Sequence, residues 1–160
     1  MRQVTVLVCG EPMRGDDGVG LAVAAALPSS AARLAEIRHV GSLMPDDLVD
    51  VTGPLVLVDA VVGPTPGAIV DIPLAAVAAD AGTAPTSRSS HALSLPAILG
   101  ISSALGRQLP AGRFIGVAAG KVTVGEGLSP EVAFAVEPAA RQLAAWIRRL
   151  AGQRGAPTCA

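Results

Sequence analysis

The feature that most constrains the fold is an almost continuous apolar run at residues 54–63, PLVLVDAVVG, which a single acidic residue, Asp59, interrupts. A run of β-branched residues and leucine predicts a strand covered on both faces, as in a mostly parallel sheet. Residues 3–9 have the same character and predict a second buried strand. Helical patterns alternate with strands along the chain, so we expect a three-layer α/β/α sandwich with a mostly parallel, mixed sheet of the phosphorylase/hydrolase-like kind.

The remaining elements follow from periodicity and from turn and cap signals. We expect further strands at 35–40, at 68–72 (an edge strand) and at 113–119, and helices at about 17–27, 44–52, 74–79 and 92–105. Ser129, Pro130 and Glu131 form a helix-start signal that opens a last helix of five turns. Residues 81–90 have loop composition. We therefore expect a single α/β/α domain over residues 1–151 and a flexible tail at 152–160.

Charge, hydropathy and cysteine content exclude several classes of protein. The net charge is −1 and the basic residues are scattered, which argues against a nucleic-acid partner. No apolar run approaches the ~18 residues of a membrane span, and no export signal is visible, so we expect a cytoplasmic protein. Cys9 and Cys159 are too few for a disulfide framework or a zinc knuckle. Cys9 ends a strand and is expected to be a small buried hydrophobe.

Two adjacent carboxylates, Asp16 and Asp17, follow the first strand in the loop CGEPMRGDDG. One of them can simply cap the helix that follows, with its carboxylate on free N–H groups. That explanation leaves the second carboxylate and the flanking glycines unexplained. We interpret Asp16 as the cap or loop anchor and Asp17 as the functional carboxylate, and we expect Gly10 and Gly41 to shape the cleft beside them.

Asp59 has two interpretations that the sequence leaves open. It can lie just past the end of its strand and accept a hydrogen bond from a neighbouring loop N–H. Alternatively it faces Asp17 across the sheet edge, because the first and third strands would be neighbours in a doubly wound order. A buried carboxylate with no partner would cost several kcal/mol, so Asp59 must be compensated in either case.

His91 is the candidate third member of the site. It closes a polar loop and opens a helix in SRSSHALSLP, whereas His39 lies within a strand-like segment and is interpreted as a structural histidine. Two carboxylates and an imidazole could hold zinc or nickel and leave positions for water or substrate. A nucleotide site is disfavoured, because the first loop lacks both the phosphate-loop lysine and the glycine spacing of a dinucleotide fingerprint.

The segments GEPMRGDDGVG, LVLVDAVVG, SSHALSL and GLSPEV, in this order, resemble the hydrogenase maturation proteases over nearly the whole chain. The resemblance implies a cytosolic, aspartyl-type endopeptidase that trims the C-terminal extension from the large-subunit precursor of a nickel–iron hydrogenase. It also implies that Asp17, Asp59 and His91 are both the metal contacts and the catalytic residues. The nickel would arrive with the substrate, and zinc or cadmium could substitute for it.

Two departures from the family pattern keep other functions open. Glu11 stands where the family usually has asparagine, and AAGKVTVGEG replaces an acidic, proline-containing segment. A non-catalytic assembly factor that binds the metallated precursor is therefore one alternative. A metallohydrolase that holds its own zinc is the other, although tight metal binding needs outer-shell partners that the sequence does not reveal. We expect a monomer.

Overall fold

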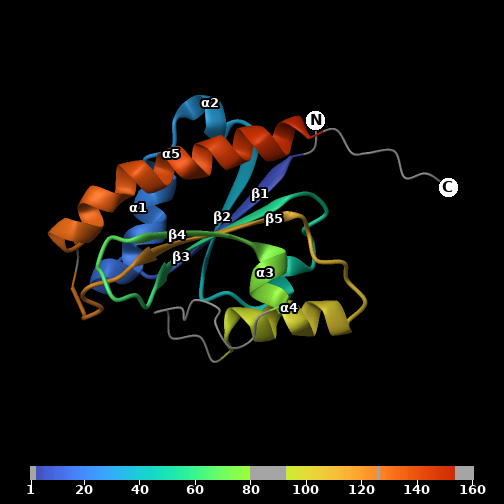
Figure 1. Cartoon of the computed structure of the whole chain (residues 1–160), viewed down its shortest axis with the longest axis horizontal. Coiled ribbons are helices and arrows are strands. Elements are labelled where there is room, and N and C mark those ends of the chain that lie inside the picture. The colour runs from blue at the N-terminus through green and yellow to red at the C-terminus, as the bar shows by residue number, and fades with distance from the viewer. Residues whose placement is uncertain (1–2, 80–92, 126, 154–160) are drawn as a thin grey trace.

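The computed structural model describes residues 3–79, 93–125 and 127–153, which form one five-stranded sheet with helices on both faces (Figure 1). The sheet order is β2-β1-β3-β5-β4. The strands are β1 (Val4–Cys9), β2 (Ala35–Gly41), β3 (Leu55–Val61), β4 (Ile69–Pro73) and β5 (Gly112–Ala118). All neighbours are parallel except β4, which runs antiparallel to β5 at the edge. The expected fold class and the expected edge strand are confirmed.

The helices form the outer two layers. They are η1 (Gly15–Gly18), α1 (Val19–Ala25), α2 (Ser29–Ala32), η2 (Pro45–Leu48), α3 (Leu74–Ala79), α4 (Leu95–Ala104) and α5 (Pro130–Gly152). Side chains of α1 and α5 pack with one set of strand residues, and those of α3, α4 and η2 pack with the other set. Figure 1 shows α5 running along one side of the sheet and α3 and α4 on the opposite side.

Alternation along the buried strands explains the two layers. In β3, Val56, Val58 and Ala60 face the α1/α5 side, whereas Leu55, Leu57 and Val61 face the α3/α4 side. Because both sets are apolar, the whole strand is buried, as the continuous run at 54–63 predicts. Asp59 occupies the α3/α4 register of this alternation.

Several expected boundaries are wrong in detail. The first helix is split: Gly15–Gly18 form a 3-10 turn, and the α-helix itself covers only Val19–Ala25 instead of 17–27. The expected helix at 44–52 is a short 3-10 turn, Pro45–Leu48, and the short helix α2 was not expected. Gly18 lies at the junction of η1 and α1, and Gly53 and Pro54 follow the segment 44–52. Glycine and proline favour short turns over regular helix.

The predicted start of α5 is right in position but wrong in the role given to the Ser129 side chain. Ser129 does occupy the cap position, with Pro130 at the first helical position, but its side chain makes no capping hydrogen bond. Its hydroxyl is used elsewhere, as the next subsection describes. None of the helices in the described part of the chain is long and apolar enough to cross a membrane. The expected flexible tail lies largely outside the described residues, and the division at residue 151 stays a prediction.

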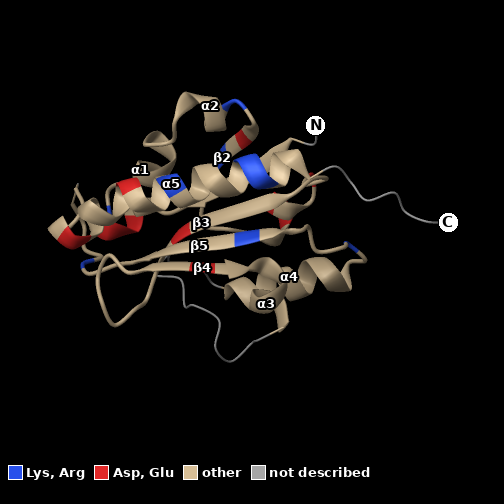
Figure 2. Ribbon diagram, turned by 45° about the horizontal axis from the view of Figure 1, so that its top comes forward, with Lys and Arg blue, Asp and Glu red and all other residues tan. Residues whose placement is uncertain are grey.

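The chain order fixes where a site can form. After β1 the chain crosses to β2 on one side, and it later enters β3 on the other side of β1. The carboxyl ends of β1 and β3 therefore flank the point at which the strand order reverses, where ligands bind in open α/β sheets. Figure 2 shows acidic residues near the end of the sheet where α5 begins, which is this same end.

Candidate metal-binding site at the carboxyl edge of the sheet

Asp17 is a buried carboxylate at the end of β1. Its side chain lies in η1, and the residue is 1% exposed. The backbone N–H of Glu11 donates to Oδ2 at 3.0 Å. The second oxygen, Oδ1, is buried and has no hydrogen-bond partner among the described residues. A buried carboxylate oxygen without a partner is costly, so this atom is suited to accept a ligand from outside the described chain.

Gly10 allows the β1 loop to fold back onto Asp17. Its φ is 110°, and a Cβ on this residue would stand 1.9 Å from the backbone oxygen of Asp17. The N–H of Gly10 donates to the carbonyl oxygen of Gly41 at 2.8 Å, which ties the loop to the end of β2. The two glycines expected beside the site are therefore in contact with each other and, through Gly10, with Asp17.

Asp59 lies within β3 rather than past its end, and it is 4% exposed. The last residue pair between β1 and β3 is Val8 with Val58, so Asp59 is the first β3 residue beyond that pairing. The expectation that the first and third strands are neighbours is confirmed. Asp59 Oδ1 accepts a hydrogen bond at 2.8 Å from the N–H of Ala60, a residue of the same strand and not of a neighbouring loop.

Cys9 is a neighbour of both carboxylates. Burial raises the pKa of its thiol, and the negative charges of Asp59, Asp47 and Asp17, in that order, raise it further. The Cys9 thiol therefore feels the charge of both Asp17 and Asp59. The expectation of a small buried hydrophobe is confirmed, because Cys9 is 2% exposed and free.

Asp16 faces away from Asp17 and anchors the loop that follows β5. Its carboxylate accepts hydrogen bonds from the N–H groups of Gly120 (2.9 Å), Lys121 (2.7 Å) and Ser129 (2.6 Å), and from the Ser129 hydroxyl (2.8 Å). Burial by itself would raise the Asp16 pKa, but these four hydrogen bonds outweigh it and hold the pKa below its usual value. The interpretation as a loop anchor is confirmed, and the helix-cap alternative is wrong because no side chain caps η1.

The backbone reinforces this connection between two distant loops. The N–H of Asp16 donates to the Lys121 carbonyl at 2.9 Å, and Gly15 and Gly125 are joined at 2.9 Å. A second bond at 2.9 Å runs from the N–H of Gly125 to the Met13 carbonyl. Sequence reasoning missed this partner loop. The sequence signals for this loop are its glycines and Ser129, and their pattern predicts only a connecting segment and a helix cap.

The structure describes only one of the two histidines, His39. His91 lies outside the described residues, so its assignment as the third ligand stays a prediction. His39 lies within a strand, β2, as expected, and it is exposed; its interpretation as a structural histidine stays a prediction. In the described ranges, no three side chains of histidine, cysteine, aspartate or glutamate are grouped so that they could hold a metal ion.

Glu11 is an exposed residue whose side chain lies against Gly41. A Cβ on Gly41 would be 3.0 Å from Glu11 Oε1, a close contact that a small movement of the exposed Glu11 side chain would relieve, so it is the φ of 60° at Gly41 that favours glycine there. The backbone N–H of Glu11 binds Asp17, whereas its side chain points toward the end of β2. The departure from the family pattern at this position therefore affects the rim of the site, and the contact with Asp17 uses backbone only.

Solved structures of known proteins match this fold closely. No model of a protein family matches the sequence, and no curated protein matches it significantly. The hydrogenase maturating endopeptidase HybD from E. coli matches with a TM-score of 0.73 and 24% identity, over 92% of this chain and 93% of that one. An endopeptidase from Escherichia coli, solved in solution, matches with a TM-score of 0.71 and 25% identity over the same shares.

An archaeal structure gives the same result. The [NiFe] hydrogenase maturation protease HybD from Thermococcus kodakarensis matches with a TM-score of 0.67 and 22% identity, over 88% of this chain and 96% of that chain. These matches span nearly the full length of each chain, which agrees with the resemblance in the sequence motifs. The chain has the fold of the hydrogenase maturation proteases.

Proposed function

We propose that this protein is an endopeptidase that removes the C-terminal extension of a nickel–iron hydrogenase large-subunit precursor after nickel insertion. The likeness of fold to hydrogenase maturation endopeptidases supports this reaction class. The observation that carries the proposal is the buried Oδ1 of Asp17, which has no partner among the described residues. A cation that arrives with the substrate would compensate this oxygen.

The chemistry of the two carboxylates fits such a role. Asp17 lies in η1, in the connection that follows β1, and Asp59 lies in β3, the strand next to β1; both are buried, and both raise the pKa of the Cys9 thiol. Two nearby carboxylates repel each other, and a divalent cation between them would remove the repulsion. Carboxylate and imidazole ligands together suit nickel or zinc.

His91 would complete the ligand set in this proposal. The described chain resumes at Leu93, two residues later, and Leu93 packs against the same cluster that contains Cys9 and Val61. Leu93 therefore lies on the face of the sheet on which Asp59 lies. Zinc or cadmium would be expected to occupy the same three side chains when nickel is replaced.

In the proposed reaction the nickel belongs to the substrate and the protein supplies positioning. Asp17 and Asp59 hold the metal-bearing end of the precursor at the sheet edge, and His91 fixes its orientation. A bound metal can polarise the scissile carbonyl or lower the pKa of a water molecule. One of the two aspartates would then accept a proton from that water, because it lies within the same buried site.

Two other functions make different predictions. An assembly factor that binds the precursor without cutting it would use the same carboxylates, and Glu11 at the rim is the feature that favours it. A metallohydrolase with its own zinc would keep stoichiometric metal after purification. The first alternative predicts a stable complex and an unchanged precursor mass, and the second predicts activity on substrates that carry no nickel.

The decisive experiment is a cleavage assay on nickel-loaded and nickel-free precursor, read by intact mass. Wild type would be compared with Asp17→Asn, Asp59→Asn and His91→Ala. Asp46→Asn is a matched control, because Asp46 is an exposed carboxylate in η2 outside the proposed ligand set. We expect loss of a C-terminal peptide only with nickel, with full activity in wild type and the control.

Each outcome leads to a distinct conclusion. A loss of about 100-fold or more in all three site variants, with unchanged thermal unfolding, supports the proposed roles. Stable binding without a change in mass, across several cognate precursors, would refute the peptidase proposal and support the assembly factor. Equal cleavage of nickel-free precursor would refute the role given to substrate nickel.

A further inference from the structure

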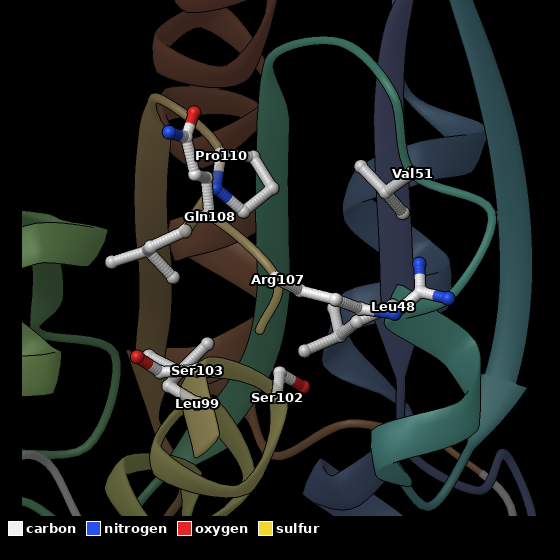
Figure 3. A pocket seen from close by; sticks show the side chains of 9 residues that line it. Leu48, Val51, Leu99, Ser102, Ser103, Arg107, Gln108 and Pro110 are labelled. Atoms are coloured by element: carbon white, nitrogen blue, oxygen red, sulfur yellow. The ribbon is translucent and has the colours of Figure 1, made fainter. Parts of the chain in front are cut away.

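A second candidate site lies at the opposite end of the sheet, where the strands β3 and β5 begin. A cavity of about 180 Å³ opens between the end of α4, η2 and the segments that lead into β3 and β5. Its lining includes Ser102, Arg107 and several apolar side chains, Leu48, Val51, Leu99 and Pro110 among them (Figure 3). These segments join the amino ends of β3 and β5, and Leu55 at the start of β3 lies about 13 Å along the strand from Asp59. The cavity is therefore separate from the metal site proposed above.

Ser102 places an unused hydroxyl at this cavity. The residue is 7% exposed, and its Oγ has no hydrogen-bond partner among the described residues. In the interior of a helix a serine hydroxyl usually finds a backbone carbonyl or water. A buried hydroxyl that lines a cavity is available to a ligand that enters it.

The end of α4 brings a positive charge to the same place. Gly106, with a φ of 77°, reverses the chain after the helix, and the N–H of Arg107 donates to the Ser102 carbonyl at 3.2 Å. The N–H of Gly106 donates to the Ser103 carbonyl at 3.0 Å, so the pattern is that of a Schellman cap. This cap fixes Arg107 directly beside Ser102.

The Arg107 side chain is one of those that line the cavity. Figure 3 shows it extending from the α4 side toward η2, where Nη1 donates to the carbonyl oxygen of Val49. That contact uses one of the five N–H groups of a guanidinium. Among the described residues that line the cavity there is no aspartate or glutamate, and Arg107 is the only charged residue of that set.

These features select the charge and shape of a ligand. A guanidinium and a hydroxyl donor together match a carboxylate, which accepts from both. The five apolar lining residues, Leu48, Val51, Leu99, Leu109 and Pro110, match an aliphatic body. The Ser102 and Ser103 carbonyls at the end of α4 already accept hydrogen bonds from the N–H groups of the cap. The positive charge of Arg107 also compensates the partial negative charge at this end of the helix, which would otherwise repel a carboxylate.

The volume limits the size of that body. A cavity of about 150 Å³ in another protein accepts benzene, so a cavity of this size holds roughly six to eight non-hydrogen atoms. We propose that this cavity binds a terminal carboxylate on a short, branched aliphatic body. The source is either a free short-chain acid or the last residue of a peptide chain, because the two present the same chemistry.

The proposal is tested by calorimetric titration of the full chain with 4-methylpentanoate and, separately, with N-acetylalanyl-leucine. Their amides are the matched uncharged probes. We expect one saturable site with a Kd on the order of 1 mM for at least one acid, and no saturable binding of its amide. Binding of the peptide alone would identify a peptide C-terminus as the source, and binding of the free acid would identify a small acid.

Three variants show whether the titration reports this cavity. Arg107→Gln is expected to weaken binding about tenfold, because it removes the charge that meets the carboxylate. Ser102→Ala is expected to weaken it about threefold without lowering the unfolding temperature, since it removes a buried hydroxyl that has no partner in the described chain. Arg141→Gln changes an exposed arginine on α5, outside the cavity, and should leave binding unchanged.

Several results would overturn the proposal. They are equal binding of acid and amide, affinity that neither Arg107→Gln nor Ser102→Ala changes, or no saturable binding of either acid at about 10 mM, which is well above the expected Kd. None of these measurements uses a hydrogenase precursor. Failure here would therefore not affect the proposed peptidase activity, and failure there would not affect this site.

Discussion

Asp16→Asn tests whether a single side chain connects the β1 loop to the loop after β5. Asp16 is fully buried, and its carboxylate accepts four hydrogen bonds from residues 104 to 113 positions later in the chain. Asparagine has nearly the same shape but only one acceptor oxygen. Its NH₂ group would face the Ser129 N–H, which is left without an acceptor.

The expected loss follows from the number of bonds. A hydrogen bond to a charged group contributes about 1.5–3 kcal/mol. Three of the four bonds end on Oδ2 and one, from the Ser129 N–H, ends on Oδ1, so an asparagine with its oxygen in the Oδ2 position keeps three bonds and loses one. The three that remain are weaker, because their acceptor no longer carries a charge. Gly120 and Lys121 are exposed, so water replaces part of what is lost. We expect the free energy of unfolding to fall by about 2–3 kcal/mol, which corresponds to an unfolding temperature lower by about 5–10 °C for a chain of this size.

The dependence on pH distinguishes a charged anchor from a merely well-packed residue. Because the folded-state pKa of Asp16 is lowered, the unfolded state binds more protons as the pH falls. The contribution of Asp16 is therefore fully present above the ordinary carboxyl pKa of about 3.9 and is lost as the pH falls through the lower folded-state value. Asp16→Asn should remove this part of the acid destabilisation.

Urea unfolding followed by circular dichroism, from neutral pH down to about pH 3, would measure both effects. Asp46→Asn is the control, because Asp46 is exposed and its replacement should change stability by less than about 0.5 kcal/mol. The reasoning is refuted if Asp16→Asn costs no more than the control. It is also refuted if the two variants lose stability in parallel as the pH falls.

Three further predictions follow from the site and its surroundings. Asp17→Asn should leave the free energy of unfolding unchanged or raise it by up to about 1 kcal/mol while abolishing cleavage, because it removes a buried charge of which one oxygen has no partner among the described residues; a clear loss of stability in urea unfolding would contradict this. Gly10→Ala should cost more than about 3 kcal/mol or prevent folding, since its Cβ would meet the Asp17 carbonyl oxygen at 1.9 Å, whereas Gly100→Ala in open space on α4 should stabilise by about 0.5–1 kcal/mol in the same measurement. Cys9 should react with Ellman's reagent at about pH 8 only after unfolding, because burial and the nearby carboxylates raise its pKa; a Cys159→Ser variant isolates this thiol, and rapid labelling of the folded protein would refute the assignment.

The sequence determined the layers of this protein because burial on both faces leaves a local pattern. The apolar side chains of the run at 54–63 point to both faces of the sheet, so both faces had to be covered by helices, and β3 is buried throughout. The edge strand and the α3 segment were predicted nearly to the residue from composition and turns. The same logic predicted that the first and third strands, β1 and β3, are neighbours, since strand order follows from short crossovers.

Only the tertiary structure decided what each polar side chain does. Asp16, Asp17 and Ser129 all have the sequence character of helix caps, yet none of them caps its helix with its side chain. Asp16 and Ser129 bind each other across 113 positions of the chain, and a local pattern carries no information about such a contact. Asp17 binds the backbone N–H of Glu11 in its own loop. The sequence supplied the two carboxylates, and the packing of the loops decided that one became an anchor and the other was left with an open oxygen.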